Sequence, residues 1–185
     1  LVLSTNRKGW NNSTALGVSY NGSSTTNRGL YVFATDSNGN TVKYPDFEYL
    51  RLWVDFTDVD FRKACFGLVD SDGNLYSTDD TDNDSDSPFY YLPDGETEWK
   101  TYQHGDDGCF GTAQSSSVKN FKGWMAFPVE KFSKRGGGGV RFSGNYVKGV
   151  YMYWDFSSPS MLGKQFYLDE FQLVDDYTVF EKYGN

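Results

Sequence analysis

Apolar and polar residues alternate along most of this chain, and this alternation is the pattern of half-buried β-strands. The clearest run covers residues 49–56, whose apolar face comprises Leu50, Leu52, Val54 and Phe56. Turn dipeptides such as Asn21-Gly22 and Asp94-Gly95 separate one run from the next. Because no run has the period of an α-helix, the sequence predicts an all-β fold, an antiparallel β-sandwich with jelly-roll topology.

The same alternation predicts further strands at residues 15–20, 30–34, 64–69, 74–77, 89–92, 98–102, 123–128, 140–142, 147–156 and 165–174. A short helical turn is predicted near residues 128–133. Loops are predicted at the acidic run 79–86 and at the glycine run 136–139. No domain boundary interrupts this pattern, so we expect residues 1–185 to form a single domain.

The composition narrows the kind of partner. The chain has a formal net charge of −8 and a sequence pI of about 4.6. An acidic domain repels phosphate, so we expect no nucleic-acid partner, and no apolar run is long enough to cross a bilayer. Aromatic residues make up 18% of the chain, including 14 Tyr and 5 Trp. Such rings carry polar atoms that need partners when buried. Their excess predicts a binding surface for neutral glycans, and the alternative is a tyrosine-rich sandwich with half-exposed rings.

The two cysteines, Cys65 and Cys109, leave two interpretations open. A disulfide between them would suit an extracellular protein, whereas two separate buried thiols would be ordinary core residues. The single histidine is His104, and no neighbouring serine or cysteine recommends a catalytic triad around it. We expect an extracellular, secreted or surface-attached monomer that is one module of a longer polypeptide.

The second face of residues 49–56 carries rings and charges, namely Tyr49, Arg51, Trp53 and Asp55. Sugar rings have apolar faces that stack on aromatic side chains, and their hydroxyl groups pair with planar polar groups. Trp53 flanked by Arg51 and Asp55 supplies both kinds of contact, and an exposed Trp would otherwise be a liability. We therefore predict that this face binds carbohydrate. The alternative is that a neighbouring loop covers Trp53.

The next-to-last predicted strand repeats this design, with Tyr151, Tyr153 and Asp155 opposite an apolar face. If both strands lie in one sheet, their rings and carboxylates form a joint groove. The alternative for each Tyr is a solvated ring that stabilises the sheet through cross-strand contacts. Trp124 and Trp99 are further candidates for the sugar-binding surface or its rim.

Three segments near the C-terminus stand out as a series: FKGWMAFPVEKF at 121–132, VKGVYMYWDF at 147–156 and QFYLDEFQLV at 165–174. This series resembles the C-terminal half of jelly-roll carbohydrate-binding modules from bacterial plant-cell-wall-degrading, cellulosome-like systems. NNSTALGVSY at 11–20 is similar to the first strand of those modules. The resemblance implies a non-catalytic module that binds plant cell-wall β-glucan, either cellulose or hemicellulose, by aromatic stacking.

The same resemblance implies one structural Ca²⁺ between the first and last strands, with Asp169 as a ligand. A second calcium candidate is the acidic run 79–86, whose aspartates alternate. That run departs from the EF-hand pattern, so a solvated loop is favoured. The segment 70–74 is better interpreted as a hairpin turn than as a calcium loop.

Two other classes of function remain open. A jelly-roll glycoside hydrolase would need two carboxylates roughly 5–10 Å apart across a cleft. Asp55 and Asp155 could form such a pair, although they serve equally well as hydroxyl acceptors, and none of the six Glu residues stands in a known hydrolase motif. His104 with Arg51 could serve a lyase. A cell-surface adhesin would instead present an edge strand or an apolar patch to another protein.

Overall fold

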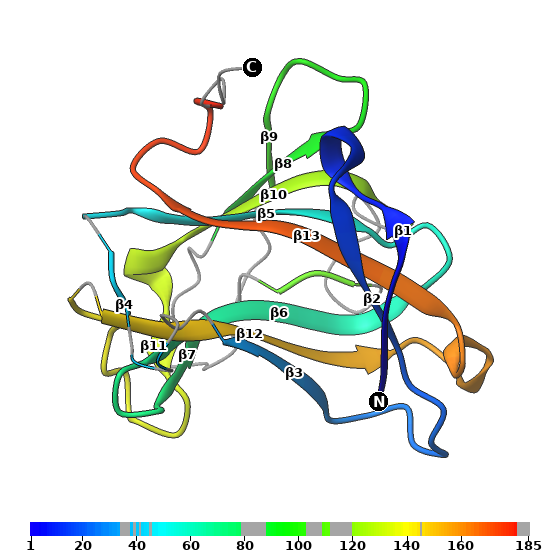
Figure 1. Cartoon of the computed structure of the whole chain (residues 1–185). Helices are drawn as coiled ribbons and strands as arrows, with labels where there is room; N and C mark the ends of the chain where they lie inside the picture. The colour runs from blue at the N-terminus through cyan, green and yellow to red at the C-terminus, as the bar shows by residue number, and fades with distance from the viewer. Residues whose placement is uncertain are drawn as a thin grey trace.

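The computed structural model of this chain describes residues 1–33, 38, 40, 42–44, 46–78, 88–102, 109–111, 120–144 and 146–180. Within these residues the chain is all-β, and its strands form two antiparallel sheets, seen as an upper and a lower layer in Figure 1. The described helical segments are single 3₁₀ turns: Trp10–Asn12, Val129–Lys131 and Pro159–Met161. The second of these confirms the turn predicted near residues 128–133. No helix in the described part is long and apolar enough to cross a membrane.

The larger sheet contains the first and the last strand of the chain. In order across this seven-stranded sheet, its strands are β1 (Val2–Lys8), β2 (Thr14–Ser19), β13 (Gln165–Val174), β5 (Tyr49–Asp55), β10 (Lys122–Pro128), β8 (Phe89–Pro93) and β9 (Lys100–Tyr102). The six-stranded sheet has the order β11 (Ser133–Lys134), β7 (Leu75–Ser77), β6 (Phe61–Asp70), β12 (Tyr146–Phe156) and β3 (Arg28–Phe33), and β4 (Val42–Lys43) also pairs with β12. Neighbours in each sheet therefore come from distant parts of the chain.

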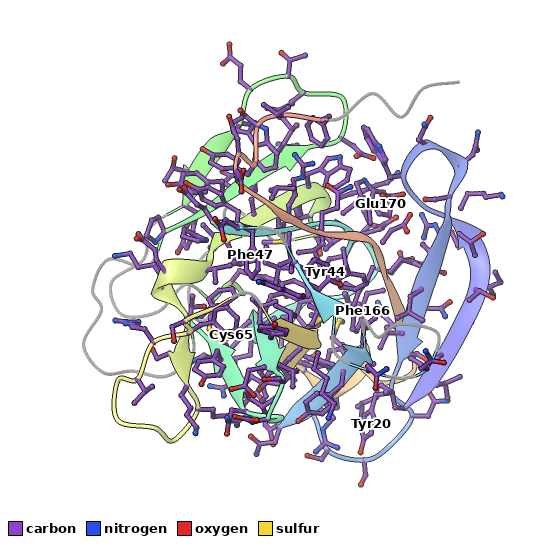
Figure 2. The ribbon with its side chains drawn as sticks, turned by 60° about the vertical axis from the view of Figure 1, so that its left-hand side comes forward. Tyr20, Tyr44, Phe47, Cys65, Phe166 and Glu170 are labelled. Carbon is purple, nitrogen blue, oxygen red and sulfur yellow. A yellow bond between two sulfur atoms is a disulfide. The ribbon has the colours of Figure 1, made fainter. Side chains whose placement is uncertain are left out.

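The core lies between the two sheets, where side chains from both layers meet (Figure 2). Phe66 of β6 contacts Phe127 of β10 with ring centroids 5.4 Å apart, and Trp154 of β12 contacts Phe166 of β13 at 5.3 Å. The predicted apolar face of residues 49–56 is confirmed, because all of its members are almost fully buried. Each such side chain stabilises the fold by about 1.5–3 kcal/mol. The alternation in the sequence is therefore an alternation between this core and the outer surfaces.

Some strand bounds differ from the prediction. Residues 140–142 form no strand, and only Arg141 makes an isolated bridge, to Ser133. The strand predicted at 98–102 begins at Lys100. β1 lies outside the predicted strands because it is an edge strand with mostly exposed residues on both faces, so its sequence has no need of apolar alternation.

A β-bulge in β13 changes which of its residues face the core. Asp169 pairs with Trp53, but the next pair in the register is Gln172 with Arg51, and Glu170 has a positive φ of 51°. A bulge inserts an extra residue into one strand, so Gln172 faces the same side of the sheet as Asp169 despite their odd spacing. The bulge thereby brings the Gln172 amide beside Arg51.

A disulfide joins Cys65 of β6 to Cys109, which decides between the two interpretations that the sequence left open. Phe110, the residue next to Cys109, exchanges two backbone hydrogen bonds with Ala64. The segment 109–111 is thus attached to β6 by a covalent bond and by a β-bridge.

Candidate functional site

The strands β5 and β12 lie in different sheets, so the joint groove expected from the sequence does not form. Six of the predicted site residues belong to the seven-stranded sheet and its connections: Tyr49, Arg51, Trp53, Asp55, Trp99 and Trp124. Three others belong to the six-stranded sheet, namely Tyr151, Tyr153 and Asp155. Because these residues alternate with core residues along their strands, the two groups face opposite outer surfaces, with the core between them.

On the six-stranded sheet, the predicted tyrosines contact other parts of the protein. Tyr151 is buried, its hydroxyl accepts a hydrogen bond from Arg135 (2.6 Å), and its ring stacks on Tyr31 with centroids 5.5 Å apart. Tyr153 is half-buried, and its hydroxyl donates to the side-chain oxygen of Asn27 (3.0 Å). These contacts favour the interpretation in which both tyrosines stabilise the sheet.

Asp55 and Asp155, the carboxylate pair considered for hydrolysis, lie in different sheets and each contacts its own arginine. Asp55 is buried and forms an ion pair with Arg7 of β1 at 2.8 Å. Asp155 is also buried, pairs with Arg62, and accepts a hydrogen bond from the backbone N–H of Asn27 (2.7 Å). Both carboxylates therefore attach strands and loops to one another, and they do not share a sheet surface.

Aromatic side chains gather on the outer side of the seven-stranded sheet, and we call this surface the aromatic face. Its buried layer is Trp53 and Trp124. Its outer layer comprises Trp10, Tyr49, Tyr90, Trp99, Tyr177 and Phe180. Figure 1 shows that the turn between β1 and β2, the β8–β9 connection and the chain beyond β13 all rise on this side of the sheet. The fold thus collects rings from distant parts of the sequence.

The buried layer is formed by Trp53 of β5 and Trp124 of β10, which are partners in the strand register. They are 3% and 2% exposed, so the structure shows the alternative in which Trp53 is covered. Trp53 Nε1 donates to Asp94 Oδ1 (3.0 Å). Trp124 Nε1 has no hydrogen-bond partner among the described residues, and a buried unpaired donor costs about 1–3 kcal/mol. The floor of the aromatic face therefore contains one donor that an acceptor could satisfy.

At one end of the outer layer, Phe180 contacts two tryptophans. Its ring is within 25° of parallel to Trp10 and within 15° of parallel to Trp99, and each pair of centroids is 6.3 Å apart. Trp124 meets Trp10 and Phe180 edge to face, at 5.3 and 5.0 Å. Trp10 is 40% exposed and Phe180 is 37% exposed. This end of the face is therefore a row of three rings that is open to solvent.

Three tyrosines extend the aromatic face along β5. Tyr177 stacks on Tyr90 with centroids 4.3 Å apart, and it meets Tyr49 and Trp99 edge to face at 4.9 Å. Burial, followed by the neighbouring Tyr90 phenol, raises the pKa values of Tyr49 and Tyr177 above the ordinary value of 10.0. Both phenols are therefore protonated at neutral pH and can donate hydrogen bonds.

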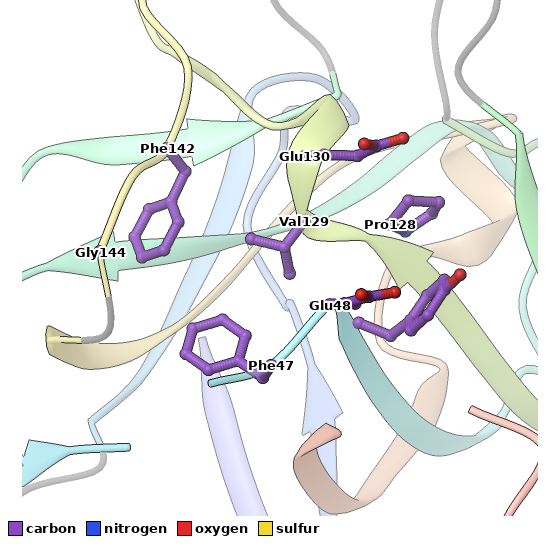
Figure 3. Close-up of a pocket in the computed structure, with 8 residues that line it drawn as sticks. Phe47, Glu48, Pro128, Val129, Glu130, Phe142 and Gly144 are labelled. Carbon is purple, nitrogen blue, oxygen red and sulfur yellow. The ribbon is translucent and has the colours of Figure 1, made fainter. Parts of the chain in front are cut away.

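A pocket of about 370 Å³ opens beside Tyr49. Two carboxylates, Glu48 and Glu130, line it together with the rings of Phe47 and Phe142. Figure 3 shows the two phenylalanine rings grouped at one side of the pocket and the two carboxylates at the other. The negative charges of Glu48 and Glu130 add to the effect of burial on the pKa of Tyr49. The pocket therefore places hydrogen-bond acceptors at one end of the aromatic face.

Arg51 lies beneath the chain that follows β13. Its Nε and Nη2 atoms donate to Gln172 Oε1 at 2.8 and 2.6 Å. Its Nη1 atom donates to the carbonyl oxygens of Tyr177 (2.8 Å) and Val179 (2.7 Å), and its guanidinium carbon is 4.4 Å from the centroid of the Phe180 ring. Arg51 is only 3% exposed, so a ligand reaches it only when that chain moves.

Asp169, the implied calcium ligand, holds the turn that carries Trp10. Its Oδ2 atom accepts hydrogen bonds from the Trp10 N–H (3.0 Å) and the Ser13 hydroxyl, and its Oδ1 atom accepts one from the Glu170 N–H (2.9 Å). N–H groups cannot ligate a metal, and no group of three or more His, Cys, Asp or Glu side chains gathers as a metal site within the described ranges. The structural Ca²⁺ with Asp169 as a ligand therefore stays a prediction.

The remaining sequence candidates are two acidic segments and the single histidine. The acidic run 79–86 and His104 lie outside the described residues. The segment 70–74 forms the predicted turn between β6 and β7, in which the Asp70 carboxylate accepts hydrogen bonds from the N–H groups of Asp72 (2.9 Å) and Asn74 (2.8 Å). Burial would raise the pKa of Asp70, but the hydrogen bonds from Asn74 outweigh it and hold the pKa below its ordinary value. Asp70 therefore stabilises a turn.

The prediction from sequence omitted most of the outer layer. Tyr177 and Phe180 follow the last strand, where alternation no longer says which way a side chain points. One signal was present: two large rings stand close together in an otherwise polar segment, and such rings need a surface to pack against. Trp10, in the turn after β1, carried the same signal.

Compared with models of known protein families, with curated proteins and with solved structures, the chain gives no significant match. The resemblance of its C-terminal segments to jelly-roll modules therefore stays an expectation. The function is therefore inferred from the geometry of the aromatic face.

Proposed function

We propose that this chain is a jelly-roll carbohydrate-binding module that holds plant cell-wall β-glucan, either cellulose or hemicellulose, on its aromatic face. The observation that carries the proposal is the gathering of partly exposed rings over a floor of buried tryptophan. The rings available to a ligand are those of Trp10, Tyr49, Tyr90 and Trp99. Stacking a sugar on such a ring removes apolar C–H surface from water, which is favourable.

The polar groups beside the rings suit hydroxyl groups. Glu48 and Glu130 offer hydrogen-bond acceptors at the pocket, and the protonated phenol of Tyr49 offers a donor. The net charge of −8 makes a neutral polysaccharide a better partner than an anionic one. Acceptors, donors and apolar rings together match the surface of a neutral glycan.

Under this proposal the module performs no chemistry and keeps polysaccharide near an enzyme or scaffold to which it is joined. The disulfide between Cys65 and Cys109 supports an extracellular setting, where such bonds persist. One chain supplies every ring of the aromatic face, so a monomer suffices.

The first prediction concerns retention on glycan. In affinity electrophoresis with xyloglucan, mixed-linkage β-glucan, mannan or xylan, we expect Trp99→Ala and Trp10→Ala to weaken binding at least about tenfold, because each removes a central ring contact worth about 1.4 kcal/mol or more. Tyr31→Ala is the matched control, since it removes a 46% exposed ring from the six-stranded sheet. We expect that variant to be retained like the parent.

Other outcomes would contradict the proposal in distinct ways. Loss of retention only in Tyr31→Ala would move the site to the six-stranded sheet. If the parent binds none of these glycans, a protein-binding surface would be favoured. Release of reducing sugar from the same polysaccharides would favour a hydrolase, and Glu48→Gln and Glu130→Gln would then be the first variants to measure, because both residues line the pocket beside Tyr49.

A further inference from the structure

The C-terminal segment, residues 175–180, crosses the aromatic face after β13 ends at Val174 (Figure 1). Its backbone is held from below by the side chain of Arg51, whose Nη1 atom donates to the carbonyl oxygens of Tyr177 and Val179 at 2.8 and 2.7 Å. Carbonyl oxygens are acceptors of the kind that sugar hydroxyls also offer. The carbonyl oxygens of the segment therefore occupy positions at Arg51 that the hydroxyl oxygens of a ligand could take.

The Phe180 ring occupies a space beside Trp10 and Trp99, which we call the slot. The centroids of both tryptophan rings lie 6.3 Å from the Phe180 centroid, and both rings are near parallel to the Phe180 ring. Trp124 meets the Phe180 ring edge to face at 5.0 Å, and the Arg51 guanidinium carbon is 4.4 Å from it. The Phe180 ring thus contacts two near-parallel indole rings, a third indole ring at a steep angle and a guanidinium group.

Phe180 leaves a hydrogen-bond donor beside it without an acceptor. A phenyl ring has no acceptor oxygen, and the buried Trp124 Nε1 lacks a hydrogen-bond partner within the part of the chain that the structure describes. A pyranose ring has apolar faces that suit Trp10 and Trp99, and it carries oxygen atoms at its edge. Those oxygens could accept hydrogen bonds from Trp124 and from Arg51.

We propose that the slot beside Trp10 and Trp99 is a subsite for one sugar ring and that Phe180 fills it when glycan is absent. This inference rests on the proposed function and adds its regulation. Binding of glycan requires residues 175–180 to leave the face, which removes Phe180 from the slot and frees Arg51. The measured affinity is then the intrinsic affinity reduced by the fraction of molecules in which the slot is open.

Residues 175–180 belong to no described strand, so they can leave the aromatic face without breaking a strand pair. Phe180 keeps 37% of its surface exposed. The backbone N–H and the hydroxyl of Thr178 donate hydrogen bonds to the Asp176 carboxylate, at 2.8 and 2.7 Å, and both residues belong to the segment itself. A segment outside the strand pairs opens at a lower free energy than a strand within a sheet. Its departure therefore leaves both sheets intact.

The second prediction is that removing the occupant strengthens binding. By titration calorimetry with cellohexaose and soluble mixed-linkage β-glucan, we expect Phe180→Ala to bind at least about fivefold more tightly than the parent chain. Val179→Ala is the matched control, because its side chain is 56% exposed and its carbonyl still accepts from Arg51. That control should bind like the parent, and thermal denaturation checks that both variants fold.

A second measurement keeps Phe180 in place. With 4-fluorophenylalanine at position 180, we expect the fluorine resonance to move to the position of a solvent-exposed ring as the same glycans saturate the protein. A resonance that stays unchanged at saturation would overturn the inference, even if Phe180→Ala failed to fold.

The outcomes separate this inference from the proposed function. If the parent binds glycan and Phe180→Ala binds equally or more weakly, Phe180 is part of the binding platform, and the inference is wrong while the proposed function stands. If neither the parent nor Phe180→Ala binds any probe, the proposed function fails and the inference fails with it.

Discussion

At the scale of single residues, Asp169 shows how a buried carboxylate controls a ring on the surface. It is 9% exposed and accepts hydrogen bonds from the Trp10 N–H, the Ser13 hydroxyl and the Glu170 N–H. The first two donors belong to the turn between β1 and β2, and the third lies in the bulge of β13. Asp169 is therefore a positioning residue for Trp10.

Asp169→Ala should destabilise the protein by about 1–3 kcal/mol, because it leaves part-buried donors without their acceptor, and it should also weaken glycan retention by freeing the Trp10 turn. Urea denaturation and affinity electrophoresis measure the two effects. Asp169→Asn, which keeps one acceptor oxygen, should be intermediate. A chelator that destabilises the parent but not Asp169→Ala would instead assign the calcium ion that the resemblance implies. Unchanged stability in Asp169→Ala would contradict the positioning role.

At the scale of elements, β5 connects the core to the aromatic face. Its inward side chains pack between the sheets, while Tyr49, Arg51 and Trp53 form part of the opposite surface. Both neighbours are needed there: β10 places Trp124 beside Trp53, and the bulge in β13 places Gln172 beside Arg51. The aromatic face is thus a product of strand order and register.

The disulfide is also an interaction between elements, and its contribution is open to measurement. Cys65→Ala combined with Cys109→Ala should lower the free energy of unfolding by about 2–4 kcal/mol. The reason is that a disulfide between residues 65 and 109 closes a loop and so restricts the unfolded chain. Urea denaturation of the double variant measures the loss. Because Cys65 lies on β6 of the six-stranded sheet, glycan retention should be unchanged in native buffer. Loss of retention without loss of stability would contradict this separation.

At the scale of the whole molecule, tyrosines link stability to alkaline pH. Burial is the first cause that raises the pKa values of Tyr49, Tyr177 and the core residue Tyr76, followed by the Tyr90 phenol for the first two and by Asp70 for the third. The folded state therefore binds these protons more tightly than the unfolded state does. The stability that they contribute is complete below the unfolded-state pKa of about 10 and is lost as pH rises through the folded-state values.

We therefore expect the free energy of unfolding to fall above about pH 10. Urea denaturation at a series of pH values measures this slope. Tyr49→Phe and Tyr177→Phe should each make the slope shallower, because each removes one phenol that must ionise against burial. A slope that is identical in the parent and both variants would show that these two phenols do not control alkaline unfolding.

The sequence was sufficient for an all-β fold and for much of the core. Alternation along residues 49–56 identifies the buried members of that strand, because a side chain on a strand points to one face or the other and only one face of each sheet meets the core. The same reasoning failed in β13 beyond Asp169, where the bulge reverses the order of faces. Alternation is a local property, and a bulge is set by the neighbouring strand.

The candidate site depended on information that alternation does not contain. Alternation indicated that Trp53 and Tyr151 point away from the core, but it could not say that β5 and β12 belong to different sheets, because strand order results from contacts between distant segments. The same limit hid Phe180, whose position follows from Arg51 and Trp124. The sequence by itself determined that this chain forms strands with rings on their outer faces. Only the tertiary structure decided which rings meet, since that depends on the packing of residues far apart in the chain.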